Sequence, residues 1–366
     1  MSLKNNKSKN HKFFMHLALL QARKNLGNTS TNPSVGCVIV KNNNLISLRS
    51  TSISGRPHAE SNAIKHSSET VNGSYLYSTL EPCSNYGFTT PCVNKIIKNK
   101  IKKVYFSLKD PDIKSFNKSQ IKLKKKKINC IKGLNLNEIT SFYRSYIKFK
   151  KKSLPFVTCK IAISKDFFMK NNKNKFVTNS SSRSRVHLMR SEHDSIITSV
   201  NTVIEDNSKL NCRINGLNKF SPHVFILDKD LKIPTGSFVV KNSFYSGTTI
   251  FYNKTNLKKI KLLKKKNINL IKIDLKNNKL NLHKMLYKIK EFGFSRVFLE
   301  AGLKLTESFL NYNLIDDFYL CVSKNKIKKN GKLNFKRNLN LYLKNKKFNH
   351  ETVNLFGDKL ILYRLK

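Results

Sequence analysis

Short apolar segments alternate with helix-forming segments along the whole chain, and a basic run that ends in Ser153-Leu154-Pro155 divides this alternation in two. Proline next to a cluster of like charges is typical of a linker, because proline can continue neither a helix nor a central strand. A chain of 366 residues also holds roughly two domains of ordinary size. We therefore predict one domain over residues 1–152 and a second over residues 153–366.

The first part has the pattern of a three-layer α/β domain, in which helices cover both faces of a sheet. After a first helix around Phe13 to Leu20, an Asn-rich turn joins two strands into a hairpin. The expected elements after that helix are strands at Val35 to Lys41 and Asn44 to Arg49, a helix from His58, a strand at Ser74 to Ser78, a helix from Pro91, a strand at Lys103 to Ser107, a basic helix at Gln120 to Lys127, a strand at Ile128 to Ile131 and a helix at Asn137 to Lys152.

The second part starts with an apolar strand and a helix that opens in a serine cluster, which offers residues for an N-cap. The expected elements are strands at Phe156 to Ser164, Ser195 to Val200, His223 to Asp228, Thr248 to Tyr252, Ile268 to Ile273 and Arg296 to Glu300, and helices from Ser180-Ser181-Ser182 and at Leu282 to Phe292. Such alternation predicts a mostly parallel sheet with helices on its faces.

The net charge is +50, from 71 Lys and Arg against 21 Asp and Glu, and it is carried by 60 Lys and only 11 Arg. Arg is the residue that bidentate phosphate recognition prefers. A surplus of Lys together with Asn is more typical of drift in an A/T-rich genome than of a nucleic-acid surface. We therefore expect no specific nucleic-acid partner.

The cysteines are seven in number and scattered, which argues against a secreted disulfide framework and for a reducing compartment. The apolar run near the amino terminus is short, contains His16 and lacks a small-residue cleavage site, so we interpret it as a helix and not as a signal peptide. No apolar stretch approaches the roughly 20 residues that a membrane span needs. We expect a cytoplasmic protein with no membrane partner.

Three metal-ligand side chains stand in a characteristic order: His58 in Pro57-His58-Ala59-Glu60, Cys83 after Glu81-Pro82, and Cys92 after Pro91. One imidazole and two thiolates with a fourth position left for water form the open tetrahedral arrangement of catalytic zinc. Proline favours the first position of a helix, so Pro57 and Pro91 indicate that two helices start at the ligands. A structural zinc site is the alternative, but it would normally be closed by a fourth Cys or His.

Glu60 gives the cluster its chemistry. On a regular helix, side chains two positions apart point in different directions. His58 and Glu60 therefore reach one site most easily when they lie in the first turn of the helix. Zinc lowers the pKa of water, and a carboxylate that takes the proton and passes it to a departing amine carries out hydrolytic deamination. This order of ligands is the signature of zinc nucleobase deaminases, with a longer loop, Ser84 to Thr90, between the cysteines.

These motifs, with Asn32-Pro33-Ser34-Val35-Gly36-Cys37 before them and Cys83-Ser84-Asn85-Tyr86-Gly87 after, closely resemble the bifunctional riboflavin-biosynthesis deaminase/reductase family. The resemblance runs from about residue 14 to residue 317 and includes the long loop between the cysteines. It implies an amino-terminal cytidine-deaminase-like domain that removes an amino group from a phosphoribosylated diaminopyrimidinone. It implies a carboxy-terminal dihydrofolate-reductase-like domain that uses NADPH to reduce the ribosyl to a ribityl chain.

The resemblance also implies roles for individual residues. In the deaminase half these are Glu60 as the catalytic residue, His58, Cys83 and Cys92 as zinc ligands, and Asn32 as a further site residue. In the reductase half they are Ile163, Phe176, Thr178, Thr202, Asp206 and Gly302 at the cofactor, Asn174, Arg190, Leu210, Arg213 and Glu300 at the substrate, and Lys160 as a further site residue. Independently of the resemblance, Glu300 ends an expected strand and Gly302 opens a helix, where backbone amides can receive a phosphate. The forked guanidinium groups of Arg190 and Arg213 suit the phosphate of the substrate.

Several positions depart from the family pattern. They are Thr51 in place of a His, residues 117–119 in place of Gly-x-Gly, Phe167 in place of Gly, Phe176 in place of Trp, Ser208 in place of Pro, and residues 323–327 in place of Pro-Lys-Leu-Leu-Gly. Phe at a turn that needs a positive φ would cost stability. These changes concern substrate binding and the reductase more than the zinc chemistry.

The favoured hypothesis is a bifunctional enzyme that forms a homo-oligomer and acts on a small phosphorylated pyrimidine. Three alternatives stay open. A zinc-dependent nucleic-acid base deaminase would use the +50 charge and bind in a steeply salt-dependent way, but it leaves the second domain unexplained. A decayed homologue would keep only the deaminase step. A non-catalytic protein that adheres to RNA or membranes would bind neither zinc nor NADPH.

Overall fold

The computed structural model describes residues 2–112, 118–151, 154–174 and 176–366, and the chain divides into two compact units, Met1–Ser153 and Leu154–Lys366. The predicted boundary between residues 152 and 153 lies outside the described residues, as does residue 117 of the divergent 117–119 segment.

The first unit is built on a sheet with the strand order β2-β1-β3-β4-β5. Its strands are β1 (Gly36–Lys41), β2 (Asn44–Ser50), β3 (Tyr75–Leu80), β4 (Lys103–Leu108) and β5 (Asn129–Lys132). β1 pairs antiparallel with β2 and β3, and the pairs β3–β4 and β4–β5 are parallel. The predicted hairpin is confirmed: Asn42 and Asn43 have φ of 48° and 65°, the left-handed conformation that a two-residue hairpin turn requires.

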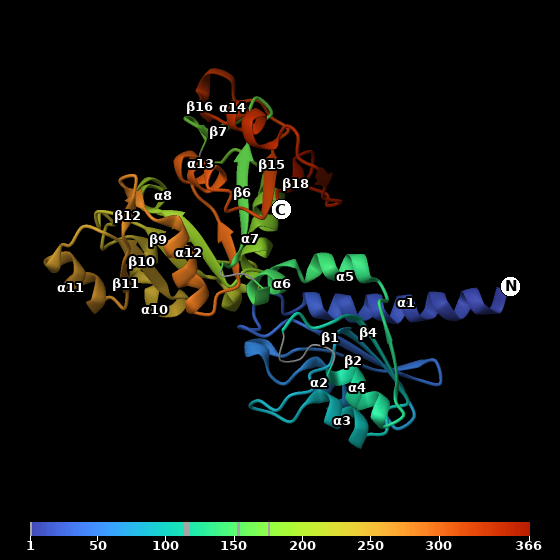
Figure 1. The fold of residues 1–366 in the computed structure, drawn as a ribbon. Coiled ribbons are helices and arrows are strands. Elements are labelled where there is room, and N and C mark those ends of the chain that lie inside the picture. Colours follow the sequence, from blue (N-terminus) through green and yellow to red (C-terminus); the bar gives the residue numbers. More distant parts are fainter. Residues whose placement is uncertain (1, 113–117, 152–153, 175) are drawn as a thin grey trace. The chain divides into compact units, whose positions relative to one another are not determined.

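Helices cover both faces of this sheet, as the three-layer pattern predicts (Figure 1). They are α1 (Ser2–Arg23), α2 (Ala59–Lys65), α3 (Cys92–Lys98), α4 (Lys118–Lys125), α5 (Leu136–Phe142) and α6 (Arg144–Lys151). Successive residues of β3 point to opposite faces. The hydroxyl of Tyr77 therefore meets His11 of α1, whereas the hydroxyl of Ser78 meets Glu60 of α2.

The single helix predicted over Asn137 to Lys152 is wrong, because α5 ends at Phe142 and α6 starts at Arg144. Tyr143 between them is almost fully buried. Its hydroxyl lies 2.7 Å from the hydroxyl of Thr79 and donates to the carbonyl oxygen of Ser34 at 3.0 Å. The helix is interrupted where a buried hydrogen-bonded side chain anchors the chain to the sheet.

The second unit is built on a sheet with the order β11-β10-β9-β8-β14-β6-β15-β18-β17. Neighbours from β11 to β15 are parallel, and the last two strands of the order, β18 and β17, pair antiparallel, so the expected mostly parallel sheet is confirmed. The strands are β6 (Phe156–Ile163), β8 (Ser195–Ser199), β9 (His223–Leu227), β10 (Thr248–Tyr252), β11 (Asn269–Lys272), β14 (Arg296–Leu299), β15 (Asp317–Val322), β17 (Phe348–His350) and β18 (Lys359–Arg364). Two small antiparallel pairs complete the unit. β12 (Leu275–Lys276) and β13 (Lys279–Leu280) form a hairpin, whereas β7 (Phe168–Asn171) pairs with β16 (Gly331–Asn334), which is distant in sequence.

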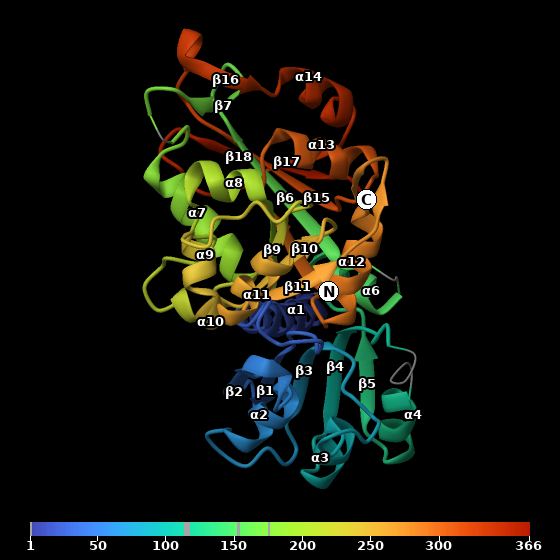
Figure 2. The same cartoon turned by 90° about the vertical axis from the view of Figure 1, so that its left-hand side faces the viewer.

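The alternation of side chains along the strands separates two hydrophobic cores. Ile197 and Val297 belong to a core that includes Met285 of α12, whereas Ile196 and Phe298 belong to a core that includes Met189 of α7. The helices of this unit are α7 (Ser180–Ser191), α8 (Val200–Asp206), α9 (Phe238–Lys241), α10 (Ser243–Ser246), α11 (Leu257–Lys265), α12 (Leu282–Glu291), α13 (Leu303–Asn311) and α14 (Lys336–Asn338). Figure 2 shows β6 running between the α7–α8 side and the α12–α13 side of the unit.

Two local expectations are tested in this unit. Helix α7 begins at Ser180, but its N-cap is Asn179, whose side chain accepts from the backbone N–H of Ser182, so the serine cluster does not supply the cap. Phe167, where the resemblance expects glycine, has a φ of 71°. This position requires the left-handed conformation, and Phe adopts it at a cost of about 1 kcal/mol or more.

Among the residues that the structure describes, no helix is both long enough and apolar enough to cross a membrane.

Candidate active sites

The three predicted metal ligands come together in the first unit, each at the end of an element. His58 is the N-cap residue of α2, Cys83 lies in the loop after β3, and Cys92 is the first residue of α3. His58 Nδ1 lies 3.4 Å from Cys83 Sγ and 3.5 Å from Cys92 Sγ. Within the described residues these side chains form the one group of three His, Cys, Asp or Glu donors whose ligand atoms all lie within 4.8 Å of one another.

This donor set fits zinc. A nitrogen and a sulfur bound to one tetrahedral zinc at ordinary bond lengths lie about 3.6 Å apart. The observed separations of 3.4 and 3.5 Å are close to that value, so little rearrangement is needed to hold an ion. Three protein ligands and the absence of a fourth donor within this group match a catalytic site better than a closed structural site.

The thiol of Cys83 is prepared to bind a metal. Its sulfur accepts the backbone N–H of Cys92 at 3.2 Å, at the amino end of α3. Hydrogen bonds, first with Cys92 and then with His58, lower the pKa of Cys83, against the effect of burial. A thiolate is the form of cysteine that ligates a metal.

Glu60 lies beside the ligands and is only 3% exposed. Its Oε1 accepts from the Ser78 hydroxyl at 3.0 Å, and Cys92 Sγ lies 3.4 Å from its Oε2. Burial, and then the negative charge of Cys83, raise the pKa of Glu60 above its ordinary value. A buried carboxylate with a raised pKa can both take and return a proton near neutral pH.

Two further positions of this half support the loop that carries His58. The Asn32 side-chain amide donates to the carbonyl oxygen of Gly55 at 3.1 Å, and Gly55 has a φ of 89°. A Cβ on Gly55 would stand 2.6 Å from Asn32 Nδ2, so only glycine fits there. Thr51 is buried, and its hydroxyl accepts the backbone N–H of Val35 at 3.0 Å.

A cavity of about 1140 Å³ opens in the second unit at the carboxyl ends of β8, β9 and β14. Open α/β sheets bind ligands at this edge. The cavity brings together seven predicted site residues, which are Lys160, Arg190, Thr202, Asp206, Leu210, Glu300 and Gly302.

The other predicted residues are not among those that line this cavity. Ile163 is buried at the end of β6, and Asn174 and Phe176 are exposed in the loop after β7, where Arg183 stacks on the Phe176 ring at 4.2 Å. The carbonyl oxygen of Thr178 accepts from Arg183 Nη1 at 2.6 Å. Arg213 is exposed and lies near Arg190. Partial burial, and then the charge of Arg190, lower the pKa of Arg213.

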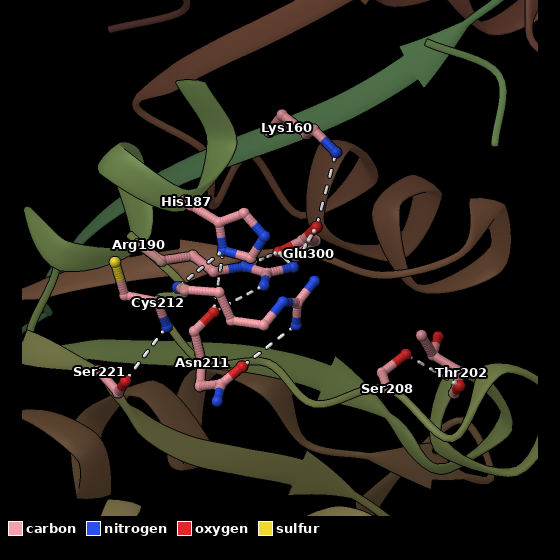
Figure 3. A network of polar contacts seen from close by, with 10 residues as sticks. Lys160, His187, Arg190, Thr202, Ser208, Asn211, Cys212, Ser221 and Glu300 are labelled. Atoms are coloured by element: carbon pink, nitrogen blue, oxygen red, sulfur yellow. Dashed lines mark hydrogen bonds and ion pairs between the residues drawn. The ribbon is translucent and has the colours of Figure 1, made fainter. Parts of the chain in front are cut away.

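Arg190, Glu300 and Lys160 form a buried ionic cluster (Figure 3). Arg190 Nε and Nη2 donate to the two Glu300 oxygens at 2.9 and 3.0 Å, and Lys160 Nζ lies 3.5 Å from Glu300 Oε1. Burial alone would raise the pKa of Glu300, but Arg190 and Lys160 lower it to about 2. The sequence predicted that the guanidinium of Arg190 binds a phosphate. In this structure the guanidinium is instead paired with the Glu300 carboxylate.

The amino end of α13 fits the phosphate of a dinucleotide. Gly302 is its N-cap residue and makes no side-chain cap, so the first N–H groups of the helix are open to a ligand. A Cβ on Gly302 would meet nothing within 4 Å, so the glycine borders open space on the cavity. The Ser199 hydroxyl, by contrast, caps α8 through the Thr202 N–H.

Sequence reasoning missed other side chains that line the cavity, among them Lys170, Asn201, Lys229, Lys276, Asn278 and His283. Lys229 Nζ donates to Asn278 Oδ1 at 2.7 Å. Lys229 follows a strand that was predicted, and the carboxyl ends of parallel strands share one edge of a sheet, so this residue could have been found. Lys276 and Asn278 lie on the β12–β13 hairpin and do not directly follow a predicted strand, so the sequence pattern did not place them at this edge of the sheet.

Comparison with known proteins assigns both halves. Residues 8–108 match the cytidine and deoxycytidylate deaminase zinc-binding region, and residues 155–324 match the RibD C-terminal domain. The first unit is thus cytidine-deaminase-like and the second has the dihydrofolate-reductase-like fold of that domain.

Similar proteins span nearly the whole chain. The riboflavin biosynthesis protein RibD of Aquifex aeolicus is 31% identical over 307 residues, which are 83% of this chain and 84% of that protein. The structure of Acinetobacter baumannii RibD, 26% identical, has a TM-score of 0.81 over 98% of this chain and 99% of the other. A diaminohydroxyphosphoribosylaminopyrimidine deaminase/5-amino-6-(5-phosphoribosylamino)uracil reductase from Thermotoga maritima, 25% identical, has a TM-score of 0.82 with the same coverage. The chain therefore belongs to the family of bifunctional riboflavin-biosynthesis deaminase/reductases, with zinc and NADPH as its cofactors.

Proposed function

We propose that residues 1–152 deaminate diaminohydroxyphosphoribosylaminopyrimidine and that residues 153–366 then reduce its ribosyl group. His58, Cys83 and Cys92 hold one zinc ion in the first domain. The observation that carries the proposal is the convergence of these three donor atoms beside the buried carboxylate of Glu60.

Glu60 moves the protons of the first reaction. Zinc supplies the Lewis acidity that brings the pKa of water near neutrality. Glu60, kept in place by the Ser78 hydroxyl, takes a proton from the attacking water and gives it to the departing amine. Burial of Glu60, the larger cause of its raised pKa, favours the protonated form that returns the proton to the amine.

The cavity of the second domain binds NADPH and the deaminated product together. NADPH supplies the hydride for the ribosyl carbon. The N–H groups at Gly302 and the start of α13 bind the cofactor phosphates, and Thr202 and Asp206, which also line the cavity, contact the cofactor. Lys160, Arg190 and Glu300 orient the substrate and Leu210 packs against it. Arg213, which lies near Arg190 outside the cavity lining, binds the phosphate of the substrate.

The remaining roles and partners are part of the same proposal. Asn32 supports the His58 loop, and Ile163, Asn174, Phe176 and Thr178 contribute from the margin of the reductase site. The partner is a small phosphorylated pyrimidine and not a nucleic acid. All seven cysteines lie in the described residues and are free thiols, which fits a reducing cytoplasm. We also expect a homo-oligomer, which light scattering of the purified protein would reveal.

The substitution Glu60→Gln tests the proton transfer. The variant keeps the size of the side chain but cannot carry the proton, so ammonia release should fall by about 10³-fold while the protein retains about one zinc per chain. NADPH oxidation with the deaminated substrate should be unchanged. Retained deamination in this variant would disprove the role of Glu60.

A further inference from the structure

The turn of Asn211, Cys212 and Arg213 lies against helix α7 beside the Glu300 cluster (Figure 3). His187 and Arg190 stand three residues apart on α7, so they share one face of the helix. Arg190 Nη1 donates to the carbonyl oxygen of Asn211 at 2.9 Å, and His187 Nδ1 accepts the backbone N–H of Arg213 at 3.3 Å. The helix therefore holds this turn at two points.

The contacts of Nδ1 depend on the tautomer of the imidazole. The Arg213 N–H meets an acceptor at Nδ1 when the ring proton of neutral His187 is on Nε2. With the proton on Nδ1, the ring would instead donate to the Asn211 carbonyl oxygen, which lies 3.1 Å away and also accepts from Arg190. Burial, and then the charges of Arg190 and Arg213, lower the pKa of His187 to about 4. The ring is thus neutral, and able to accept a hydrogen bond, at neutral pH.

The charges around the turn favour an anion. Arg190 donates hydrogen bonds from Nε and Nη2 to Glu300, and Lys160 forms an ion pair with the same carboxylate. Arg213 is exposed, and within the described part of the chain its Nη1 donates to the neutral side chain of Asn211 at 3.2 Å. The three cations face one carboxylate, so the excess of positive charge suits a phosphate dianion, and Arg213 is the cation whose fork faces solvent.

We propose that His187 is a positioning residue of the reductase, whose Nδ1 fixes the backbone of Arg213 and so aims the Arg213 guanidinium at the phosphate of the substrate. The inference rests on the proposed function, in which Arg213 binds that phosphate. A fixed backbone reduces the conformational freedom that Arg213 loses when the anion binds, which strengthens binding without changing the chemical step.

Two substitutions separate this role from a merely structural one. His187→Leu fills a similar volume but cannot accept the Arg213 N–H, whereas His187→Asn places Oδ1 near the position of Nδ1. His187→Leu should raise the KM for the deaminated phosphoribosyl substrate about tenfold, with kcat and the Kd for NADPH within about twofold of wild type. His187→Asn should restore KM to within about threefold. If the leucine variant fails to fold, His187→Gln, which moves the acceptor farther along the side chain, takes its place.

A double-mutant cycle with Arg213→Met distinguishes the two ways to fail. If Arg213→Met leaves KM unchanged, Arg213 does not bind the phosphate and this part of the proposed function is wrong. If Arg213→Met raises KM but His187→Leu does not, or if the asparagine variant is as impaired as the leucine variant, the positioning role alone is wrong. In the Arg213→Met background His187→Leu should change KM by less than about twofold, and a full tenfold effect there would overturn the inference.

Discussion

The two active sites of this chain are built in opposite ways. The deaminase site takes all its reacting groups from residues 58–92, and three of them stand at the start of a helix or just before it. The reductase site collects side chains from residues 160–302 at the edge of a sheet, where Lys160 of β6 and Glu300 at the end of the neighbouring strand β14 meet Arg190 of α7. The groups of the first site are close together in sequence, whereas those of the second are brought together by the tertiary fold.

Replacing a zinc ligand gives the largest expected effect. Cys83→Ser removes the sulfur that accepts the Cys92 N–H and lies 3.4 Å from His58 Nδ1. The zinc content measured by atomic absorption should fall from about one per chain towards zero, and ammonia release should stop, while the reductase stays active. Cys130→Ser, at a half-buried thiol outside the cluster, is the matched control and should keep its zinc. A zinc-loaded Cys83→Ser protein would refute the ligand set.

Removing the charge of Glu300 should weaken the reductase domain without touching the first site. Because the folded-state pKa of Glu300 is about 2 and its ordinary value is 4.5, the ionised form stabilises the fold by about 3 kcal/mol. For a lowered pKa this stabilisation is complete above pH 4.5 and is lost as the pH falls towards 2.

Denaturant unfolding of the wild type and of Glu300→Gln, followed from pH 7 downward, measures this contribution. The difference in unfolding free energy should be about 3 kcal/mol at neutral pH and should shrink in acid. Glu205→Gln, at an exposed ion pair with Lys170, should change the stability by less than about 1 kcal/mol. A difference for Glu300→Gln that is independent of pH would mean that its charge is not what stabilises the cluster.

Gly302 gives the smallest expected effect and the cleanest one. Since a Cβ there meets no protein atom within 4 Å, Gly302→Ala should leave stability unchanged but crowd the cofactor phosphates and raise the Kd for NADPH about tenfold. Gly236→Ala, whose Cβ is equally free of contacts, should leave the Kd unaltered. NADPH binding is measured by fluorescence titration. Equal Kd values for the two variants would show that the cofactor phosphates do not lie at the amino end of α13.

The contrast between the sites also explains what the sequence could predict. His58, Cys83 and Cys92 follow local rules of helix starts and ligand spacing, so the convergence of these three side chains was predicted, and the structure shows it. The hairpin at Asn42 and Asn43 follows from residues that tolerate a positive φ. Where short-range preferences decide the structure, prediction succeeded.

Where tertiary contacts decide, prediction failed. The break at Tyr143 depends on a buried hydroxyl that reaches Thr79. The pairing of Arg190 with Glu300 depends on residues 110 positions apart. The antiparallel pairing of β15 with β18 also joins distant segments, in a tail where the family pattern fades.

The most direct test of the two-site account is incubation of the full chain with diaminohydroxyphosphoribosylaminopyrimidine, with ammonia and NADPH absorbance followed separately. The account predicts ammonia release with or without NADPH, and NADPH oxidation only after deamination has begun. It also predicts that the deaminated substrate is reduced at the wild-type rate by Glu60→Gln. Ammonia release that requires NADPH, or loss of both activities in Glu60→Gln, would contradict two separate sites.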